Sequence, residues 1–229
     1  MDSTLHYQKS PLGDSGVCLT SAYLAPVEYY SAMAKADVVY FEHCDYYVKQ
    51  TYRNRCHIAA ANGVMALSIP VEKTSSAKIL TRDVRISDHN DWQLNHWRSI
   101  ESAYNSTPFF EYYKDDLLPF YEKKWTFLWD FNQEIQTRVL ELLELKSEIQ
   151  LTDEYKITLN ESVLDLRESI HPKKQDLHAE YKPYYQVFEQ RFGFQPNLSI
   201  IDLLFNMGNE AQLIISPLNP PQGDFKRLN

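Results

Sequence analysis

Residues 16–42, GVCLTSAYLAPVEYYSAMAKADVVYFE, decide the fold of this 229-residue chain. Residues 17–20 are an apolar run of strand length, and residues 38–41 are a β-branched and aromatic run. Between them, Pro26 suits the first turn of a helix, and apolar residues recur after it at helical spacing. A strand, a helix and a strand within about 30 residues have the size of a βαβ unit, so we predict two parallel strands joined by a right-handed crossover.

A β-hairpin and three helices are predicted next. Residues 47–58 alternate between apolar and polar, residues 64–71 form another strand-like run, and Asn62-Gly63 between them favours a tight turn. Later apolar residues recur at helical spacing and predict helices over residues 90–104, 108–123 and 128–142. We therefore expect a mixed α/β fold: an N-terminal strand–helix–strand and a β-hairpin sheet, followed by a helical segment that packs on it.

The remaining signals are shorter. Asn90 and Gln93 match a capping box at the start of the helix predicted over residues 90–104. Ser199 and Asp202 match a second capping box before the apolar run 200–205, and Gly208 suits the end of that helix. Further strand candidates lie at residues 84–86, 149–151 and 157–159. We assign residues 14–216 to a single domain because no internal stretch has linker composition, and we expect residues 1–13 and 217–229 to be irregular tails.

The composition disfavours several classes of protein. The net charge of −8 opposes the broad attraction that duplex nucleic acid requires. No apolar run approaches the roughly 20 residues of a membrane span, and the polar N-terminus does not resemble a signal peptide, so we expect a cytoplasmic protein.

Cofactor and metal signals are weak. Phosphate-loop, dinucleotide, nucleophile-elbow and zinc-protease motifs are absent, so no cofactor is predicted. The three cysteines lack paired ligand spacing, so no metal site is predicted, and we expect Cys18 and Cys44 to be small buried hydrophobes. The sequence leaves the oligomeric state open.

The segment 46–55, YYVKQTYRNR, is the strongest candidate for a binding surface. If the segment is extended, Lys49, Arg53 and Arg55 point to one face and repel each other unless an anion or acidic side chains lie opposite. A phosphate or carboxylate ligand would match the guanidinium groups. The alternative is a solvated strand face whose cations pair with nearby Glu and Asp. The candidate ligand-binding residues of this segment are Tyr47, Lys49, Arg53, Asn54 and Arg55.

Two further residues are candidates for acid–base chemistry. His96 shares an apolar helical face with Trp92, Ile100 and Tyr104, so it is either a hydrogen-bonded core residue or a catalyst with a lowered pKa. Glu111 and Asp115 are four residues apart and lie on one helical face, where paired carboxylates can share acid–base work or bind a metal. Carboxylates in a first helical turn also simply complement the helix dipole.

Several segments occur in an order that spans roughly residues 17–210. They are AYLAPVEYY (22–30), ADVVYFE (36–42), YVKQTYRNR (47–55), NG…LSIPV (62–71), WQLNHWRSI (92–100), PFFEYY (108–113) and LSIIDLLFNMG (198–208). Taken together, this ordered set resembles the WbqC-like family of bacterial proteins. That family is typically encoded with enzymes of surface-polysaccharide and O-antigen assembly.

The resemblance implies a cytoplasmic role around nucleotide-linked sugars. The leading hypothesis is a protein that binds a nucleotide sugar or a similar anionic small molecule, with transfer onto an amino sugar as its activity. Under that hypothesis Lys49, Arg53 and Arg55 neutralise phosphate. Tyr23 and Tyr47 contact the sugar or the base, and His96 or Glu111 supplies acid–base chemistry.

Two departures from the family pattern keep a second hypothesis open. Family members usually carry a histidine–glutamine–proline motif where this chain has LTSA at residues 19–22. The family's glycine-bearing segment before the last helix is also hard to find, and IHPKK at residues 170–174 stands in that region, which implies a shortened pocket. The alternative is therefore a non-catalytic binding or scaffold protein of the same pathway.

Overall fold

The computed structural model describes residues 16–73, 78–174 and 181–215. The predicted tails, 1–13 and 217–229, lie outside the described residues. A parallel sheet has the strand order β5-β2-β1-β6. Its strands are β1 (Gly16–Thr20), β2 (Val38–Glu42), β5 (Glu148–Leu151) and β6 (Val163–Asp165).

The predicted βαβ unit is confirmed. Helix α1 (Val27–Lys35) connects β1 to β2, and the two strands pair in parallel from Gly16↔Val38 to Thr20↔Glu42. All five residues of β2 are buried, as expected for a parallel strand covered on both faces. Gly16 is needed at the start of β1, because a Cβ atom there would lie 2.5 Å from the carbonyl oxygen of Val38.

The predicted hairpin is also confirmed, but its first arm is shorter than expected. Strand β3 (Arg55–Ala60) pairs antiparallel with β4 (Gly63–Ser68), and Gly63 alone in the turn has a positive φ, 106°. The strand prediction over residues 47–54 is wrong. The chain turns at Gln50, whose φ is 62°, and the Thr51 hydroxyl donates a 2.9 Å hydrogen bond back to the Val48 carbonyl.

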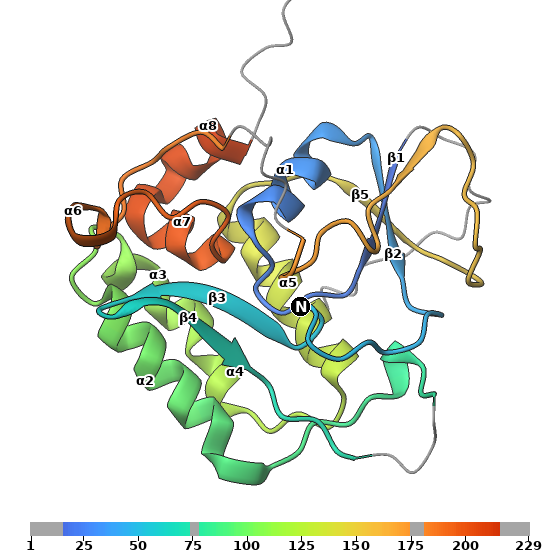
Figure 1. Ribbon diagram of the computed structural model, residues 1–229, viewed down its shortest axis with the longest axis horizontal. Helices are drawn as coiled ribbons and strands as arrows, with labels where there is room; N and C mark the ends of the chain where they lie inside the picture. The colour runs from blue at the N-terminus through green and yellow to red at the C-terminus, as the bar shows by residue number, and fades with distance from the viewer. Residues whose placement is uncertain (1–15, 74–77, 175–180, 216–229) are drawn as a thin grey trace, which may run out of the picture.

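The helical segment packs between and beside the sheets. Pro119 divides the predicted helix over residues 108–123 into two, since proline cannot donate the next helical hydrogen bond. In Figure 1, α5 lies between the parallel sheet and the hairpin, and the hairpin passes over α2. The larger helices are α2 (Trp92–Tyr104), α3 (Phe110–Leu117), α5 (Leu128–Leu142) and α7 (Ile200–Met207). Shorter turns are η1 (Thr81–Asp83), η2 (His89–Asp91), α4 (Pro119–Glu122), α6 (Glu189–Phe192), η3 (Gly208–Glu210) and α8 (Ala211–Ile215).

Two short strand predictions and both capping boxes need correction. Residues 157–159 form no strand; β6 begins four residues later and pairs with β1. Residues 84–86 contribute only isolated bridges, to Val71 and Phe127. Neither Asn90 nor Ser199 caps a helix with its side chain: α2 starts after two residues with positive φ, and the Ser199 hydroxyl donates to the Leu24 carbonyl. Gly208 does end α7 with a positive φ, as predicted.

One hydrophobic core connects these elements, with members from β1 through α5 to α8. Within the described ranges, no helix has the length and apolarity that crossing a membrane demands.

Candidate functional site

The four parallel strands end side by side. Thr20 lies opposite Glu42, Phe41 opposite Leu151, and Cys18 opposite Asp165. Open parallel sheets bind their ligands outside the carboxyl ends of the strands, because the loops that follow each strand converge there. We call this region the carboxyl edge; its buried polar residues are Glu42, Asp45, Arg53, Thr152 and Arg167, with Asp165 beside them.

Charge is concentrated at the carboxyl edge. Glu42 is 0% exposed, Asp45 5%, Arg53 3% and Arg167 5%. Among the described residues, Asp202 is the other charged residue with so little exposure. Charged side chains are almost never fully buried unless they are paired, so a specific network must hold these four.

Glu42 and Arg167 are the centre of that network. The Glu42 carboxylate accepts hydrogen bonds from the Cys44 backbone N–H (2.8 Å), the Thr152 hydroxyl (2.8 Å) and the Arg167 guanidinium (3.0 Å). Arg167 also donates from Nε (2.9 Å) and Nη2 (2.6 Å) to the two oxygens of Asp165. Burial alone would raise the pKa of Asp165, but the hydrogen bonds and charge of Arg167 outweigh it and lower that pKa. The network therefore ties the ends of β2, β5 and β6 together.

A second buried pair is less completely satisfied. Arg53 Nη2 lies 2.6 Å from Asp45 and 3.5 Å from the exposed Glu168. The amide of Asn132 donates to the Arg53 carbonyl (2.8 Å), and the Thr81 N–H donates to the Asp45 carbonyl (2.9 Å). Four buried atoms of this group have no hydrogen-bond partner among the described residues: Arg53 Nε, Asp45 Oδ1, Asn132 Oδ1 and Thr81 Oγ1. Buried polar atoms without a protein partner are rare in folded proteins, so ordered water or an ion is the expected partner of these four atoms.

Exposed lysines lie next to His171, on which the charge of Arg53 also acts. Lys173 Nζ donates to the Gln50 side chain (2.7 Å), which joins the 47–51 turn to the segment that follows β6. Burial and the charges of Lys174, Lys173 and Arg53 lower the pKa of His171, against the opposing charge of Glu168. Burial is the larger cause of that shift, and three cationic charges act on the imidazole against one acidic charge. We call this surface, formed by Lys49, His171, Lys173 and Lys174, the basic rim.

A different set of groups lies over the ends of β2 and β5. The Cys44 sulfur is 3.8 Å from His43 Nδ1 and 3.8 Å from a guanidinium nitrogen of Arg82. The His43 ring centroid is 5.6 Å from a ring centroid of Trp129, with the planes tilted by 45°. We call His43, Cys44, Arg82 and Trp129 the aromatic corner.

The aromatic corner carries little charge apart from Arg82. Burial and the charge of Arg82 lower the pKa of His43, and burial with the charge of Glu42 raises the pKa of the Cys44 thiol. Both groups are therefore neutral near pH 7. Cys44 is only half-buried, so the prediction that it is a buried hydrophobe is wrong, whereas Cys18 is buried as expected.

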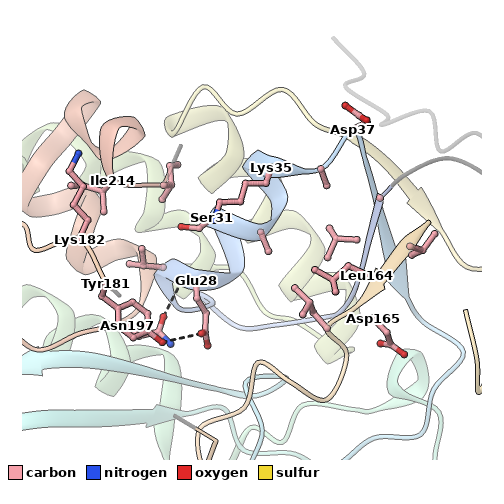
Figure 2. Close-up of a pocket in the computed structure, with 18 of the residues that line it drawn as sticks. Glu28, Ser31, Lys35, Asp37, Leu164, Asp165, Tyr181, Lys182, Asn197 and Ile214 are labelled. Carbon is pink, nitrogen blue, oxygen red and sulfur yellow. Dashed lines mark hydrogen bonds between the residues drawn. The ribbon is translucent and has the colours of Figure 1, made fainter. Parts of the chain in front are cut away.

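A second concave region runs along α1 and has a volume of about 880 Å³. Figure 2 shows Glu28, Ser31 and Lys35 directed from α1 into this groove, between α8 and β6. Tyr181 donates a 3.1 Å hydrogen bond to the Glu28 carboxylate, and the Glu28 N–H donates a 3.0 Å bond to the Asn197 side chain. Charges of both signs line the groove, so it offers no concentrated field for an anion.

Tyr23 and His96, two of the predicted site residues, meet inside the core. The Tyr23 hydroxyl is 3.0 Å from His96 Nδ1 and 2.9 Å from the Tyr121 hydroxyl, and Tyr23 is 0% exposed. The His96 ring stands edge-on to Trp92 at 5.2 Å. Burial lowers the pKa of His96 to about 4, against a hydrogen bond with the Ser68 backbone. This is the geometry of a neutral, hydrogen-bonded core histidine, and its catalytic role stays a prediction.

The residues of segment 46–55 are distributed among different surroundings. Lys49 is exposed on the basic rim, and Arg53 is buried beneath it. The Asn54 amide donates to the Ile69 carbonyl (2.8 Å), and Arg55 Nε donates to the Ser68 hydroxyl (2.9 Å) within the hairpin. Tyr47 is half-buried, and burial raises its pKa to about 12. Because the chain turns at Gln50, the three cations do not share one strand face, and that part of the prediction is wrong.

Glu111 lies in the first turn of α3. Its carboxylate is 2.6 Å from Lys114 Nζ, and its side chain is 72% exposed. An exposed pair of this kind contributes little to stability, about 0–1 kcal/mol. An acid–base role for Glu111 also stays a prediction.

The sequence contains a signal for the carboxyl edge at residues 42–45. Glu42, His43, Cys44 and Asp45 follow directly after a strand of the predicted βαβ unit. Charged and polar residues at the carboxyl end of a parallel strand are the expected place for a ligand site. Arg167 gave no comparable signal, because the three-residue β6 strand before it was not predicted.

The comparisons with known proteins identify the family of the chain. The model of the WbqC-like protein family matches residues 21–175, which include both the basic rim and the aromatic corner. The chain is also 27% identical to the uncharacterized protein Rv1507c of Mycobacterium tuberculosis, over 72% of this chain and 81% of the relative. No solved structure matches the chain significantly. The chain belongs to the WbqC-like protein family.

Proposed function

We propose that this WbqC-like protein binds a nucleotide-linked sugar, or a similar phosphate-bearing small molecule, at the carboxyl edge of its parallel sheet. Its proposed place is the biosynthesis of surface polysaccharide in the cytoplasm, as the family resemblance implies, and its proposed activity is transfer onto a sugar. The observation that carries the proposal is the basic rim: three exposed lysines and a histidine gathered above a buried arginine, in a chain of net charge −8.

Among the described residues, Glu168 is the acidic side chain that acts on the rim histidine, against the charges of Lys173 and Lys174. The rim can hold an anion because its cations outnumber that carboxylate. Lys49, Lys173 and Lys174 are exposed and would contact phosphate oxygens directly. Arg53 is only 3% exposed and is paired with Asp45 at 2.6 Å, so it would reach the ligand through ordered water. Phosphate oxygens accept charge-assisted hydrogen bonds from such groups, and these bonds are stronger than neutral ones.

A second candidate is a binding protein of the same pathway that performs no chemistry. It is favoured by the position of His96, which is 6% exposed, neutral near pH 7 and bonded to a fully buried tyrosine. A general base must reach the proton that it abstracts, directly or through one water. Both candidates bind the same ligand at the same edge, so only a measurement of turnover separates them.

A thermal-shift screen tests the binding proposal. UDP-, GDP- and dTDP-linked sugars are added to the full chain, and the midpoint of unfolding is recorded. A ligand at one hundred times its Kd adds about 2.7 kcal/mol of stability, which corresponds to roughly 5–10 °C for a chain of this size. The double variant Lys49→Ala, Lys173→Ala should lose most of that shift, whereas Lys124→Ala, which removes an exposed lysine from outside the rim, should keep it.

The screen contradicts the proposal if none of the nucleotide sugars stabilises the wild type, or if the rim variant and Lys124→Ala respond alike. Incubation of the stabilising nucleotide sugar with the protein and candidate acceptor sugars, followed by mass spectrometry, then separates the two candidates. Release of the nucleoside diphosphate with a new glycosidic product supports the transferase. Tight binding without product supports the binding protein.

A further inference from the structure

We propose that the aromatic corner binds the nucleobase of the ligand whose phosphates lie on the basic rim, so that the protein recognises a nucleoside diphosphate. This inference rests on the proposed function. It assigns the base of the ligand to the aromatic corner and the phosphates to the basic rim. The corner combines three separate segments, residues 43–44, Arg82 and Trp129, and only residues 43–44 follow a strand of the predicted βαβ unit.

The two halves of the site are contiguous along the carboxyl edge. Cys44 and Asp45 are consecutive, so their Cα atoms are about 3.8 Å apart. The Cys44 sulfur belongs to the corner, at 3.8 Å from Arg82, and the Asp45 carboxylate contacts Arg53 beneath the rim at 2.6 Å. The Thr81 N–H, next to Arg82, also donates to the Asp45 carbonyl. A nucleoside diphosphate carries its base at one end and its phosphates at the other, which matches this division.

The chemistry of the corner suits a flat, weakly polar ring. Trp129 is half-buried in the first turn of α5 and presents part of its indole beside the His43 imidazole. Aromatic side chains bind nucleobases by stacking, and every base has a face that can stack. The Arg82 guanidinium is exposed next to them and can lie over a π-system. The imidazole and the thiol are neutral and add no negative charge of their own to the corner. The carboxylates of Glu42, Asp45 and Asp153 act on His43 from beside the corner, and the charge of Arg82 opposes them.

Cys44 provides a built-in reporter for this half of the site. The chain has three cysteines, and Cys18 and Cys56 are each 0% exposed, so a thiol reagent reaches Cys44 first. A base stacked in the corner would cover the Cys44 sulfur. Phosphates bound on the rim alone would leave that sulfur reachable.

The experiment measures the rate at which N-ethylmaleimide modifies Cys44 in the full chain, by mass spectrometry, with the two buried cysteines as internal references. The probes are UDP, GDP, dTDP, inorganic pyrophosphate and glucose 1-phosphate, each at a concentration that saturates its thermal shift. At least one nucleoside diphosphate should slow modification about tenfold or more, while pyrophosphate stabilises the protein without slowing it. Trp129→Ala should weaken binding of that nucleotide about 10- to 100-fold and leave pyrophosphate binding unchanged. Trp129→Phe, which keeps an aromatic face, should retain most of the affinity.

Three results would overturn the inference. If a nucleoside diphosphate stabilises the protein but Cys44 reacts at its original rate and Trp129→Ala binds normally, the base lies elsewhere, and the proposed function survives. If glucose 1-phosphate protects Cys44 and nucleoside diphosphates do not, the corner takes the sugar. If no probe changes either the midpoint of unfolding or the reaction rate, the proposed function fails and the inference fails with it.

Discussion

Buried carboxylates are stabilised in two different ways in this protein. Asp202 in α7 is 0% exposed, and its carboxylate accepts hydrogen bonds from the Tyr104 hydroxyl (2.9 Å), the Tyr184 hydroxyl (2.7 Å) and the Gln186 amide (2.9 Å). At the carboxyl edge, Glu42 and Asp45 are instead neutralised by arginines. Neutral hydrogen-bond donors stabilise Asp202, and these donors are themselves buried. Arginines stabilise Glu42 and Asp45, and this network extends to exposed side chains such as Glu168.

The difference distinguishes a buried carboxylate that joins elements of the fold from a buried ion pair that lies next to an exposed surface. Both oxygens of Asp202 have partners, and its bonds join α7 to α2 and to the 184–186 segment. In the Arg53–Asp45 pair, Arg53 Nε and Asp45 Oδ1 have no hydrogen-bond partner within the part of the chain that the structure describes. A pair that is incompletely satisfied and lies next to exposed cations is a candidate for ligand contact, and a saturated one is a fold element.

The largest expected effect comes from breaking the edge network. Arg167→Ala leaves the Glu42 carboxylate buried without its cation, so the free energy of unfolding should fall by about 3–5 kcal/mol in urea titrations. Arg85→Ala, which removes a half-exposed arginine 3.5 Å from Glu72, should lower it by about 1 kcal/mol or less. Equal losses in the two variants would mean that the edge network is no more stabilising than a surface pair.

Asp202 should make the free energy of unfolding depend on pH. Burial raises its pKa from 3.8 to about 6, despite the three hydrogen bonds that favour the charged form. The folded state therefore holds a proton that the unfolded state releases. The stability from this group is fully present below pH 3.8 and is lost as the pH rises through about 6, by roughly 3 kcal/mol.

Asp202→Asn should remove this dependence, because the amide keeps a neutral group that the tyrosine hydroxyls can still bond. Urea unfolding of the variant between pH 4 and pH 7 checks it. A stability curve identical to that of the wild type would show that Asp202 does not titrate in this range.

His96 should change the free energy of unfolding with pH in the direction opposite to Asp202, over a similar pH range. Its substitution should lower that free energy by less than the loss of Arg167. Its pKa falls from 6.5 to about 4 on burial, so the unfolded state binds a proton that the folded state refuses. Stability from this group is present above pH 6.5 and is lost as the pH falls toward 4. His96→Ala should cost about 1–3 kcal/mol at pH 7, from the cavity and the lost hydrogen bond to the Tyr23 hydroxyl, and should flatten the acid limb of the stability curve. A variant with full stability and lost turnover would restore His96 as a catalyst.

The smallest effect on stability is expected at the basic rim. Lys49→Ala and Lys173→Ala remove exposed side chains, so each should change the free energy of unfolding by about 0.5 kcal/mol or less. Removal of a repelling cation can even stabilise the unliganded protein slightly. A loss above about 2 kcal/mol in either variant would assign the rim to the fold instead of to a ligand.

Local sequence patterns predicted the elements whose hydrogen bonds are local. The βαβ unit, the hairpin turn and the amphipathic helices follow from periodicity and from Gly63, and all three are present. Strand β6 escaped prediction because three residues pair with β1, almost 150 positions earlier in the chain. Alternation over residues 47–54 predicted a strand, but the buried Arg53–Asp45 pair and the turn at Gln50 bend that segment instead.

The site was harder to predict than the fold. The sequence singled out Lys49 and Arg53; the structure shows Lys49 exposed and Arg53 buried at the carboxyl edge. It could not reveal that Arg53 is buried against Asp45, or that residues 171–174 complete the rim, because those contacts depend on tertiary structure. The capping-box pattern at Asp202 was likewise misleading, since that carboxylate bonds to side chains of distant segments instead of capping α7.

Hydrogen–deuterium exchange with and without a stabilising nucleotide sugar tests most directly whether the carboxyl edge is the binding surface. The account predicts that the ligand slows exchange in residues 43–54 and 166–174, on both sides of the buried Arg53–Asp45 pair, and leaves α1 and α8 unchanged. Slower exchange along α1 and α8, with none at the carboxyl edge, would locate the ligand in the groove of Figure 2 and contradict the account.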